Sequence, residues 1–442
     1  MDIWIKAAQF ILSLSLLVIL HEFGHFIPAK LFKTRVEKFY LFFNPWFSLF
    51  KKKIGDTEWG IGWLPLGGFV KISGMVDESM DKEQLAQPAQ SWEFRSKPAW
   101  QRLIIMLGGV FVNVVVGFVI YIGVVAYFGV ERLEPSSLKH GVSVHPYVEK
   151  YGLKTGDYIL AVDGKETKNV LEVTSQVMFR GARNIKVRHA DGKIATIHFP
   201  ENIGHELFEN GAFPLVNLRS SSITIDSIVP KSNAAKAKLI KGDKFLTIDG
   251  KEVSYFDDIQ KQLFLNKSKT ISATILRGKD TLELNVNVTK EGTLGFMTNQ
   301  EMIDISSIKQ YKPSLGESVG LGIDLAINTL SDYTGQFKYL FTKKGASSLG
   351  GFASMGNMFP STWDWEIFWM RTAWISLALA IMNLLPIPAL DGGHVVFLLY
   401  EMITGKEAPQ KVLEIAQYVG IVLLLSLMLY ANGNDVYRIF FK

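Results

Sequence analysis

The stretch that decides the fold is 7-AAQFILSLSLLVILHEFGH-25, an apolar run that ends in a His-Glu-x-x-His motif. Residues four apart share one face of a helix, so His21 and His25 can bind a single metal ion. Neutral imidazoles suit zinc, and Glu22 beside them can take a proton from a water that the metal activates. The motif specifies only three of five positions, so a chance match is the alternative. The apolar setting argues against chance, because ionisable groups inside a membrane span are costly and usually functional.

The composition of the chain excludes several classes of protein function. The chain has 442 residues, which allows more than one domain, and a net charge of +5, which does not suggest nucleic acid. It contains no cysteine. This excludes a thiol nucleophile, thiolate zinc ligands and disulfides, but it leaves the compartment open.

Apolar stretches predict four membrane spans. The third is interrupted by prolines and by a Gly-Gly pair, and the first carries the histidine motif in its last third. No small-residue cleavage site precedes the motif, so we expect the first span to be retained. The four stretches are approximately residues 7–29, 103–130, 372–400 and 415–431.

The placement of lysine and arginine predicts the orientation. Eleven of these residues lie between Lys30 and Lys97, against one before the first span. The positive-inside rule places this loop in the cytoplasm and the long segment after the second span outside. Within the loop, residues 59–74 (WGIGWLPLGGFVKISG) predict a short hairpin or looped sheet that is buried or in contact with the membrane, and the alternative is an ordinary surface hairpin. The polar stretch 77–90 predicts a loop or a surface helix.

The external segment contains an internal repeat. Residues 152–166 (GLKTGDYILAVDGKE) and 238–252 (KLIKGDKFLTIDGKE) are identical at eight of fifteen positions, with an offset of 86. Each copy has a Gly-Asp turn, an alternating strand and an Asp-Gly turn, so two β-rich domains are expected. The pattern resembles the bacterial PDZ domain, which takes up peptides by strand addition. A pair of β modules that serve only as a spacer is the alternative.

The segment before the third span is less regular. Residues 314–340 have apolar residues at helical spacing and predict an amphipathic helix. The glycine-rich residues 345–356 predict a flexible piece.

The third span supplies a carboxylate and an amide beside helix-breaking residues, in 383-NLLPIPALDGG-393. Broken helices are tolerated in membranes where the freed backbone lines a cavity. Asp391 can complete a site of two histidines and one carboxylate, with water at the fourth position. Asn383 can donate a hydrogen bond to a peptide carbonyl, although a hydrogen bond between helices is the alternative. We interpret His394 as a packing residue.

These features together resemble the site-2 protease family. The histidine motif in a first span, the Asn-x-x-Pro-x-Pro-x-x-Asp-Gly segment in a later span and the tandem PDZ-like repeats carry the resemblance. The layout is similar to the RseP branch of that family over nearly the whole chain. The resemblance implies that zinc is held by His21, His25 and Asp391 and that Glu22 is the catalytic base.

The resemblance also implies a set of substrate-binding residues. Gly67-Gly68-Phe69-Val70-Lys71 resembles the family's membrane-reentrant β-loop, and the third-span motif is thought to contact substrate. The substrate-binding residues implied in this way are Asn383, Pro386, Pro388, Gly67, Gly68, Phe69 and Val70. One departure concerns the second-span motif Gly-Pro-x-x-Asn, which here reads 109-GVFVN-113. Val110 replaces the proline, which puts the local helix geometry in question but not the zinc chemistry.

The predicted fold is a polytopic α-helical membrane protein with four transmembrane helices, a membrane-associated β-hairpin loop and two β-rich PDZ-like domains between the second and third spans. The expected segments are the first span (1–30), the cytoplasmic or membrane-reentrant β-loop region (31–100), the second span (101–130), two PDZ-like domains (131–217 and 218–295), an amphipathic periplasmic linker (296–365), the third span (366–400), a cytoplasmic loop (401–412) and the fourth span with the C-terminal tail (413–442).

By this resemblance, the chain is an intramembrane zinc metalloprotease of a diderm inner membrane, with the PDZ-like domains in the periplasm. Its partners would be the lipid bilayer and single-span membrane proteins already trimmed outside, such as anti-sigma factors, and remnant signal peptides. Two alternatives remain. One is a membrane-anchored PDZ scaffold with a non-catalytic metal site, and the other is a transporter, which would need inverted-repeat spans.

Overall fold

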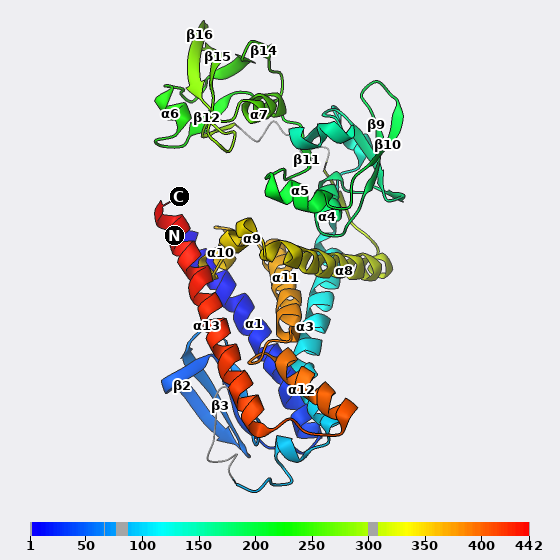
Figure 1. The fold of residues 1–442 in the computed structure, drawn as a ribbon, viewed down its shortest axis with the longest axis vertical. Helices are drawn as coiled ribbons and strands as arrows, with labels where there is room; N and C mark the ends of the chain where they lie inside the picture. The colour runs from blue at the N-terminus through cyan, green and yellow to red at the C-terminus, as the bar shows by residue number, and fades with distance from the viewer. Residues whose placement is uncertain (1, 66, 77–86, 299–307, 442) are drawn as a thin grey trace. The chain divides into compact units, whose positions relative to one another are not determined.

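The structure is a computed structural model that describes residues 2–65, 67–76, 87–298 and 308–441. The polar stretch predicted over 77–90 lies mostly outside the described residues. The chain divides into two compact units. We call them the helical unit (Met1–Gly129 and Lys312–Lys442) and the β-rich unit (Val130–Tyr311), and Figure 1 shows both.

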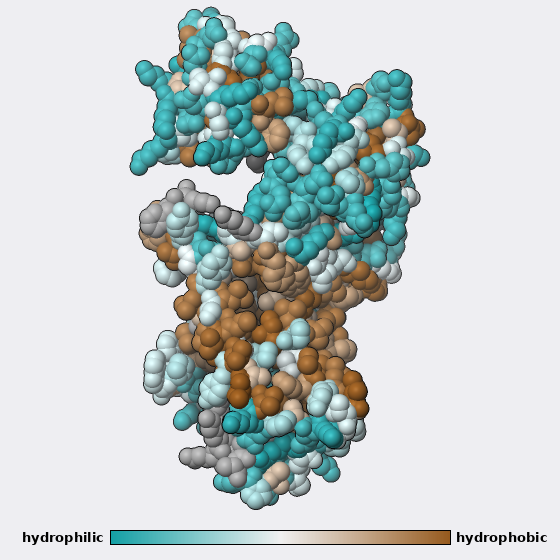
Figure 2. Space-filling model, viewed as in Figure 1, coloured by the Kyte–Doolittle hydropathy of each residue, from teal (hydrophilic) through white to brown (hydrophobic). Residues whose placement is uncertain are grey.

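The helical unit contains the long apolar helices. In the described part of the chain, four helices have the length and composition to cross a membrane. Figure 2 shows hydrophobic residues gathered over this unit, whereas the surface of the β-rich unit is mostly hydrophilic. The helices agree in place with the four predicted spans. Each begins before its apolar stretch, and the second and third end before theirs. They are α1 (Asp2–Leu31), α3 (Ala99–Phe128), α11 (Trp365–Leu384) and α13 (Gln410–Phe441).

The predicted third span is two helices rather than one. Helix α11 ends at Leu384, and a separate helix α12 (Asp391–Thr404) follows. Leu385 is extended, with φ −60° and ψ 144°, as expected for a residue that precedes a proline. Pro386 lacks the N–H that would continue the helical hydrogen bonds. The break therefore places Asp391 in the first turn of α12.

The loop after α1 forms a sheet that is larger than the hairpin predicted over 59–74. It begins at Val36, and its strand order is β2-β3-β1-β4. Strand β1 pairs parallel with β3 and antiparallel with β4, whereas β2 and β3 form an antiparallel hairpin. Strands β2 and β4 are therefore the two edges. The strands are β1 (Val36–Leu41), β2 (Phe43–Ile54), β3 (Thr57–Leu64) and β4 (Phe69–Ile72).

The two halves of the sequence repeat fold alike. The first half forms a sheet of order β10-β9-β7-β8, and the second half forms one of order β14-β13-β15-β16. In both halves, an Asp-Gly turn closes the hairpin at the end of the repeat, and both turn residues have positive φ, as this turn type requires. The φ values are 45° at Asp163, 79° at Gly164, 51° at Asp249 and 73° at Gly250. The strands are β7 (Tyr158–Val162), β8 (Lys165–Glu166), β9 (Asn184–Arg188), β10 (Ile194–His198), β13 (Lys244–Ile248), β14 (Lys251–Glu252), β15 (Thr270–Arg277) and β16 (Asp280–Asn287).

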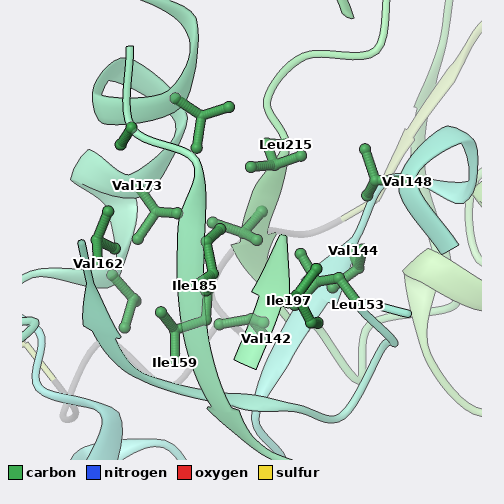
Figure 3. Close-up of a cluster of buried hydrophobic side chains, with 14 of the residues drawn as sticks. Val142, Val144, Val148, Leu153, Ile159, Val162, Val173, Ile185, Ile197 and Leu215 are labelled. Atoms are coloured by element: carbon green, nitrogen blue, oxygen red, sulfur yellow. The ribbon is translucent and has the colours of Figure 1, made fainter. Parts of the chain in front are cut away.

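Each half has its own hydrophobic core. The first core draws side chains from strands and short helices between Leu133 and Val216, and Figure 3 shows Ile159, Ile185 and Leu215 within it. The second core lies between Ile223 and Leu294. Three further strand pairs of the described part of this unit are β5 (Val130–Arg132) with β18 (Lys309–Tyr311), β6 (Val142–Val144) with β11 (Val216–Leu218) and β12 (Ile225–Ile228) with β17 (Phe296–Thr298). Its α-helices are α4 (Val173–Met178), α5 (Ile203–Glu209), α6 (Asn233–Lys236) and α7 (Phe256–Leu265).

The segment before α11 is helical throughout much of its length. Helix α8 (Leu315–Leu340) occupies the predicted amphipathic stretch and begins with a capping box. The flexibility predicted for residues 345–356 stays a prediction, but most of this stretch is helical, in α9 (Lys343–Ser348) and α10 (Phe352–Gly356). The carboxylate of Asp435, on α13, accepts hydrogen bonds of 2.9 Å from the backbone N–H groups of Gly351 and Ser354. The polar end of α13 thus holds the glycine-rich backbone in place.

Candidate metal centre

The two histidines of α1 and the aspartate of α12 meet inside the helical unit. His21 Nε2 and His25 Nε2 are 3.2 Å apart, and Oδ2 of Asp391 lies 3.4 Å from each of them. The side chains of these three residues are at most 15% exposed. One ligand atom from each residue therefore points at a common centre.

The spacing of these atoms fits a tetrahedral metal ion. Ligand bonds of about 2.0–2.1 Å, typical of zinc with nitrogen or oxygen, place two ligands of a tetrahedron about 3.3 Å apart. The three observed distances of 3.2, 3.4 and 3.4 Å match this value. Asp391 Oδ2 is also buried without a hydrogen-bond partner. A buried carboxylate oxygen needs compensation, and a metal ion would supply it.

The proton of His25 can be assigned from its neighbour. Its Nδ1 lies 2.8 Å from the backbone carbonyl of Ile105, on α3. A carbonyl oxygen can only accept, so Nδ1 carries the proton and donates. Nε2 then presents a lone pair toward Asp391. A metal-binding histidine needs this tautomer, with its other ring nitrogen held by a carbonyl or a carboxylate.

Helix α3 can approach the histidines because it lacks a side chain at Gly109. A Cβ on this residue would lie 2.6 Å from Cε1 of His21 and would also overlap the ring of His25. Val110, which follows, replaces the proline of the family motif, and α3 runs unbroken from Ala99 to Phe128. The missing proline thus leaves the helix continuous beside the site.

The turn between α11 and α12 positions the aspartate. Ala389 has φ +76°, which is uncommon for a residue with a side chain. Gly392 packs against the carbonyls of Leu384 and Leu385, and Gly420 of α13 packs against the carbonyl of Pro388. A side chain at either glycine would displace the turn that carries Asp391.

A cavity of about 170 Å³ opens beside the three ligand residues. Glu22 lines it. Asn383, at the end of α11, also lines it, with Nδ2 3.4 Å from Nε2 of His21. The edge strand β4 and the residue before it form another wall. A base, an amide donor and a strand edge therefore surround the same space.

The predicted substrate-binding residues divide into two groups. Asn383, Gly68, Phe69 and Val70 line the cavity. Gly67, Pro386 and Pro388 are absent from its described lining. Gly67 has φ +147° and lies against the ring of Phe43, whereas the two prolines belong to the turn before Asp391.

His394 lies apart from the metal-ligand residues. It lines a second cavity of about 170 Å³, together with Arg102 and Glu401. These two residues form an ion pair that joins α3 to α12. His394 is therefore not grouped with the metal-ligand residues, and its interpretation as a packing residue stays a prediction.

Several residues of the site were not predicted from the sequence. Asn113 of α3 contacts His21, with Nδ2 3.2 Å from Nδ1 of the ring, and Met75 and Met106 line the cavity. The methionines carry no recognisable motif. Asn113 belongs to the second-span motif, but that motif assigned it no role.

The three possible ligand residues, the neighbouring Glu22 and the cavity are the arrangement expected of a metal-dependent hydrolase. The comparisons with known proteins agree with this class. A family model described as Peptidase family M50 matches residues 9–427. The chain belongs to this family, which confirms the resemblance to the site-2 proteases.

Relatives of the chain match it over nearly their whole length. A protein of Rickettsia conorii is 27% identical and covers 98% of both chains. One of Clostridium perfringens is 27% identical, over 96% of this chain and 97% of its own. One of Vibrio cholerae is 28% identical, over 99% of this chain and 100% of its own. All three are described as putative zinc metalloproteases.

Proposed function

We propose that the chain is an intramembrane zinc metalloprotease that cuts a peptide bond within the transmembrane segment of single-span membrane proteins. The observation that carries this proposal is the convergence of His21, His25 and Asp391 beside Glu22, between apolar helices. The descriptions of the relatives as zinc metalloproteases support zinc as the metal. His21, His25 and Asp391 would hold it.

The residues around the cavity have separate roles in the reaction. Zinc held by His21, His25 and Asp391 would supply Lewis-acid chemistry at the scissile carbonyl and at the attacking water. Glu22 takes the proton from the attacking water and passes it to the leaving amine. Asn383 Nδ2 donates a hydrogen bond to the carbonyl oxygen, where negative charge develops.

Strand β4 presents the substrate to these groups. An α-helix keeps its carbonyls hydrogen-bonded, so a transmembrane substrate must unwind before it is cut. Strand β4 is an edge of its sheet and lines the cavity, so its free backbone groups can pair with the unwound segment. Pairing holds the segment extended and presents one carbonyl to the metal centre.

The β-rich unit acts as a filter for substrates. Its repeated sequence and its matching strand orders support two PDZ-like domains. The excess of lysine and arginine between the first two spans supports an inner-membrane orientation with this unit in the periplasm. Substrates would be single-span proteins already trimmed on the periplasmic side, such as anti-sigma factors, and remnant signal peptides. A bulky external domain would be held away from the cavity.

Cleavage by the purified full-length chain tests the proposal. A single-span substrate with a short external stub is incubated in detergent with the wild type, with Glu22→Gln and with Glu414→Gln as a matched control on α13. We expect cleavage by the wild type and the control and none by Glu22→Gln. Equal cleavage by Glu22→Gln and the wild type would exclude Glu22 as the base. No cleavage of any such substrate by the zinc-loaded wild type would favour a membrane-anchored scaffold with a non-catalytic metal site.

A further inference from the structure

Asn113 of α3 is a fully buried polar residue in contact with the metal centre. Its Nδ2 is 3.2 Å from Nδ1 of His21, and its Oδ1 is buried with no hydrogen-bond partner. A buried amide oxygen without a partner is costly, so its orientation needs an explanation.

The two orientations of the amide have opposite consequences for His21. If Nδ2 donates to Nδ1, the proton of the neutral ring lies on Nε2, which faces Asp391 and His25. A protonated Nε2 cannot bind a metal ion. If the amide is turned by 180°, Oδ1 accepts a hydrogen bond from Nδ1–H and Nε2 presents a lone pair. The oxygen and nitrogen of an amide have nearly the same shape, so both orientations fit the same space.

His25 provides the precedent within the same site. Its Nδ1 donates to the carbonyl of Ile105, which leaves Nε2 free to bind metal. Ile105 and Asn113 both lie on α3, so this helix places a hydrogen-bonding group beside the Nδ1 of each histidine. Gly109, four residues before Asn113, lies on the same face and makes room for both rings.

The backbone of Asn113 is fixed by a second helix. The hydroxyl of Ser376, on α11, donates a 2.7 Å hydrogen bond to the Asn113 carbonyl, and both residues are buried. This bond restrains the backbone without touching the amide side chain. The side-chain amide is therefore available to His21.

We propose that Asn113 is a positioning residue of the metal centre, whose Oδ1 accepts the hydrogen bond from Nδ1–H of His21 and so fixes Nε2 as a metal ligand. This inference rests on the proposed metal centre. It predicts that Asn113 contributes to zinc affinity without touching the zinc. Such outer partners of a metal-binding histidine typically change the affinity by about 10–100-fold.

The inference is tested by the zinc dissociation constant of the full-length protein in detergent. Competition with a chromophoric chelator measures this constant. Asn113→Leu removes the acceptor while keeping a similar shape, and we expect zinc affinity to fall by about 10–100-fold. Asn113→Asp keeps an acceptor oxygen and, when ionised, cannot donate, so we expect it to bind zinc at least as tightly as the wild type. Phe111→Leu, at an exposed position of the same helix, is the control and should leave the affinity unchanged.

Two results would overturn the inference. Wild-type affinity in Asn113→Leu would show that His21 needs no acceptor there. Affinity in Asn113→Asp as low as in Asn113→Leu would show that the amide acts through its N–H or through packing. These results differ from failure of the proposed function, which would appear as an absence of zinc in the wild type.

Discussion

Gly24 of α1 and Gly108 of α3 lie backbone against backbone. A Cβ on Gly24 would be 2.6 Å from the carbonyl carbon of Gly108, and a Cβ on Gly108 would be 2.7 Å from the carbonyl carbon of Gly24. Small residues at helix interfaces permit such close approach in membranes. The approach brings α3 within hydrogen-bonding distance of His21 and His25. The spacing of these two helices is therefore a condition for the metal centre.

Alanine at Gly108 should separate the two helices and move their hydrogen-bonding groups away from the histidines. Because displacements of about 1 Å can cost about 100-fold in rate, we expect at least a tenfold loss of cleavage. The initial rate on a single-span substrate is the measurement. Gly123→Ala, on the same helix, is the control, because its Cβ would have no neighbour within 4 Å. A full rate in Gly108→Ala would show that the close approach is dispensable.

Proline at Val70 or Ile72 tests strand pairing. Proline has no N–H and cannot take part fully in a ladder, so cleavage of stable helical substrates should fall while zinc content is retained. Substrates weakened by helix-breaking residues should be affected less. Lys52→Pro, on the opposite edge strand β2, is the control for disturbance of the sheet.

Val70 and Ile72 are both buried, so proline at either position could also disturb folding. A loss of cleavage is evidence for strand pairing only if the variant is folded. Expression level and zinc content must accordingly be measured with the rate. Normal cleavage of a stable helical substrate by both folded proline variants would exclude the pairing mechanism.

Part of the site could be predicted from the sequence, because its signals are local. The spacing of His21 and His25 defines a shared helix face, and Pro386 with Pro388 marks the break that frees Asp391. The contacts that Gly24 and Asn113 make could not be predicted from the sequence. They depend on how α1 and α3 pack, and the histidine motif leaves the position of Gly24 unspecified.

The same distinction applies to the fold. Four apolar stretches and one repeat predicted the long helices and two β-rich halves, because length and periodicity are local properties. The sheet between α1 and α3 was predicted too small. Strand β2 contains Pro45 and the run Lys51–Lys52–Lys53, which hide its strand character, and it pairs at an edge where such residues are tolerated. The glycine-rich residues 345–356 gave no sign of their partner Asp435, more than 70 positions away.

Removal of the β-rich unit tests the filter. A chain without residues 130–311, with a short flexible linker in their place, should cut some untrimmed substrate that the full chain rejects. Cleavage of trimmed and untrimmed substrates is compared on gels at equal protein and zinc content. Complete protection of untrimmed substrate by a deletion variant that still cuts trimmed substrate would contradict the filter.

The β-rich unit should also lose stability in mild acid through His145. Burial, together with the charge of Lys267, lowers the pKa of His145 to about 4 from its usual value near 6.5. Between these values the unfolded chain binds a proton that the folded chain does not, so the free energy of unfolding falls as pH drops through this window. The contribution is fully present above about pH 6.5.

The difference between the wild type and His145→Asn isolates this effect. Asparagine can still accept the hydrogen bond that His145 takes from the backbone N–H of Tyr147, but it does not titrate. Melting temperatures of residues 130–311, which contain two cores of their own, are compared at pH 7.5 and pH 5. We expect a smaller decrease in the variant, and equal decreases would refute the assignment.

The zinc content of the purified chain, measured by mass spectrometry, tests the metal centre most directly. The wild type and Glu22→Gln should each hold about one zinc per chain, with only the wild type active, because Glu22 acts as a base and not as a ligand. Asp391→Ala should lose the zinc, since it removes one of three ligands. Undiminished zinc in Asp391→Ala would contradict the site of His21, His25 and Asp391.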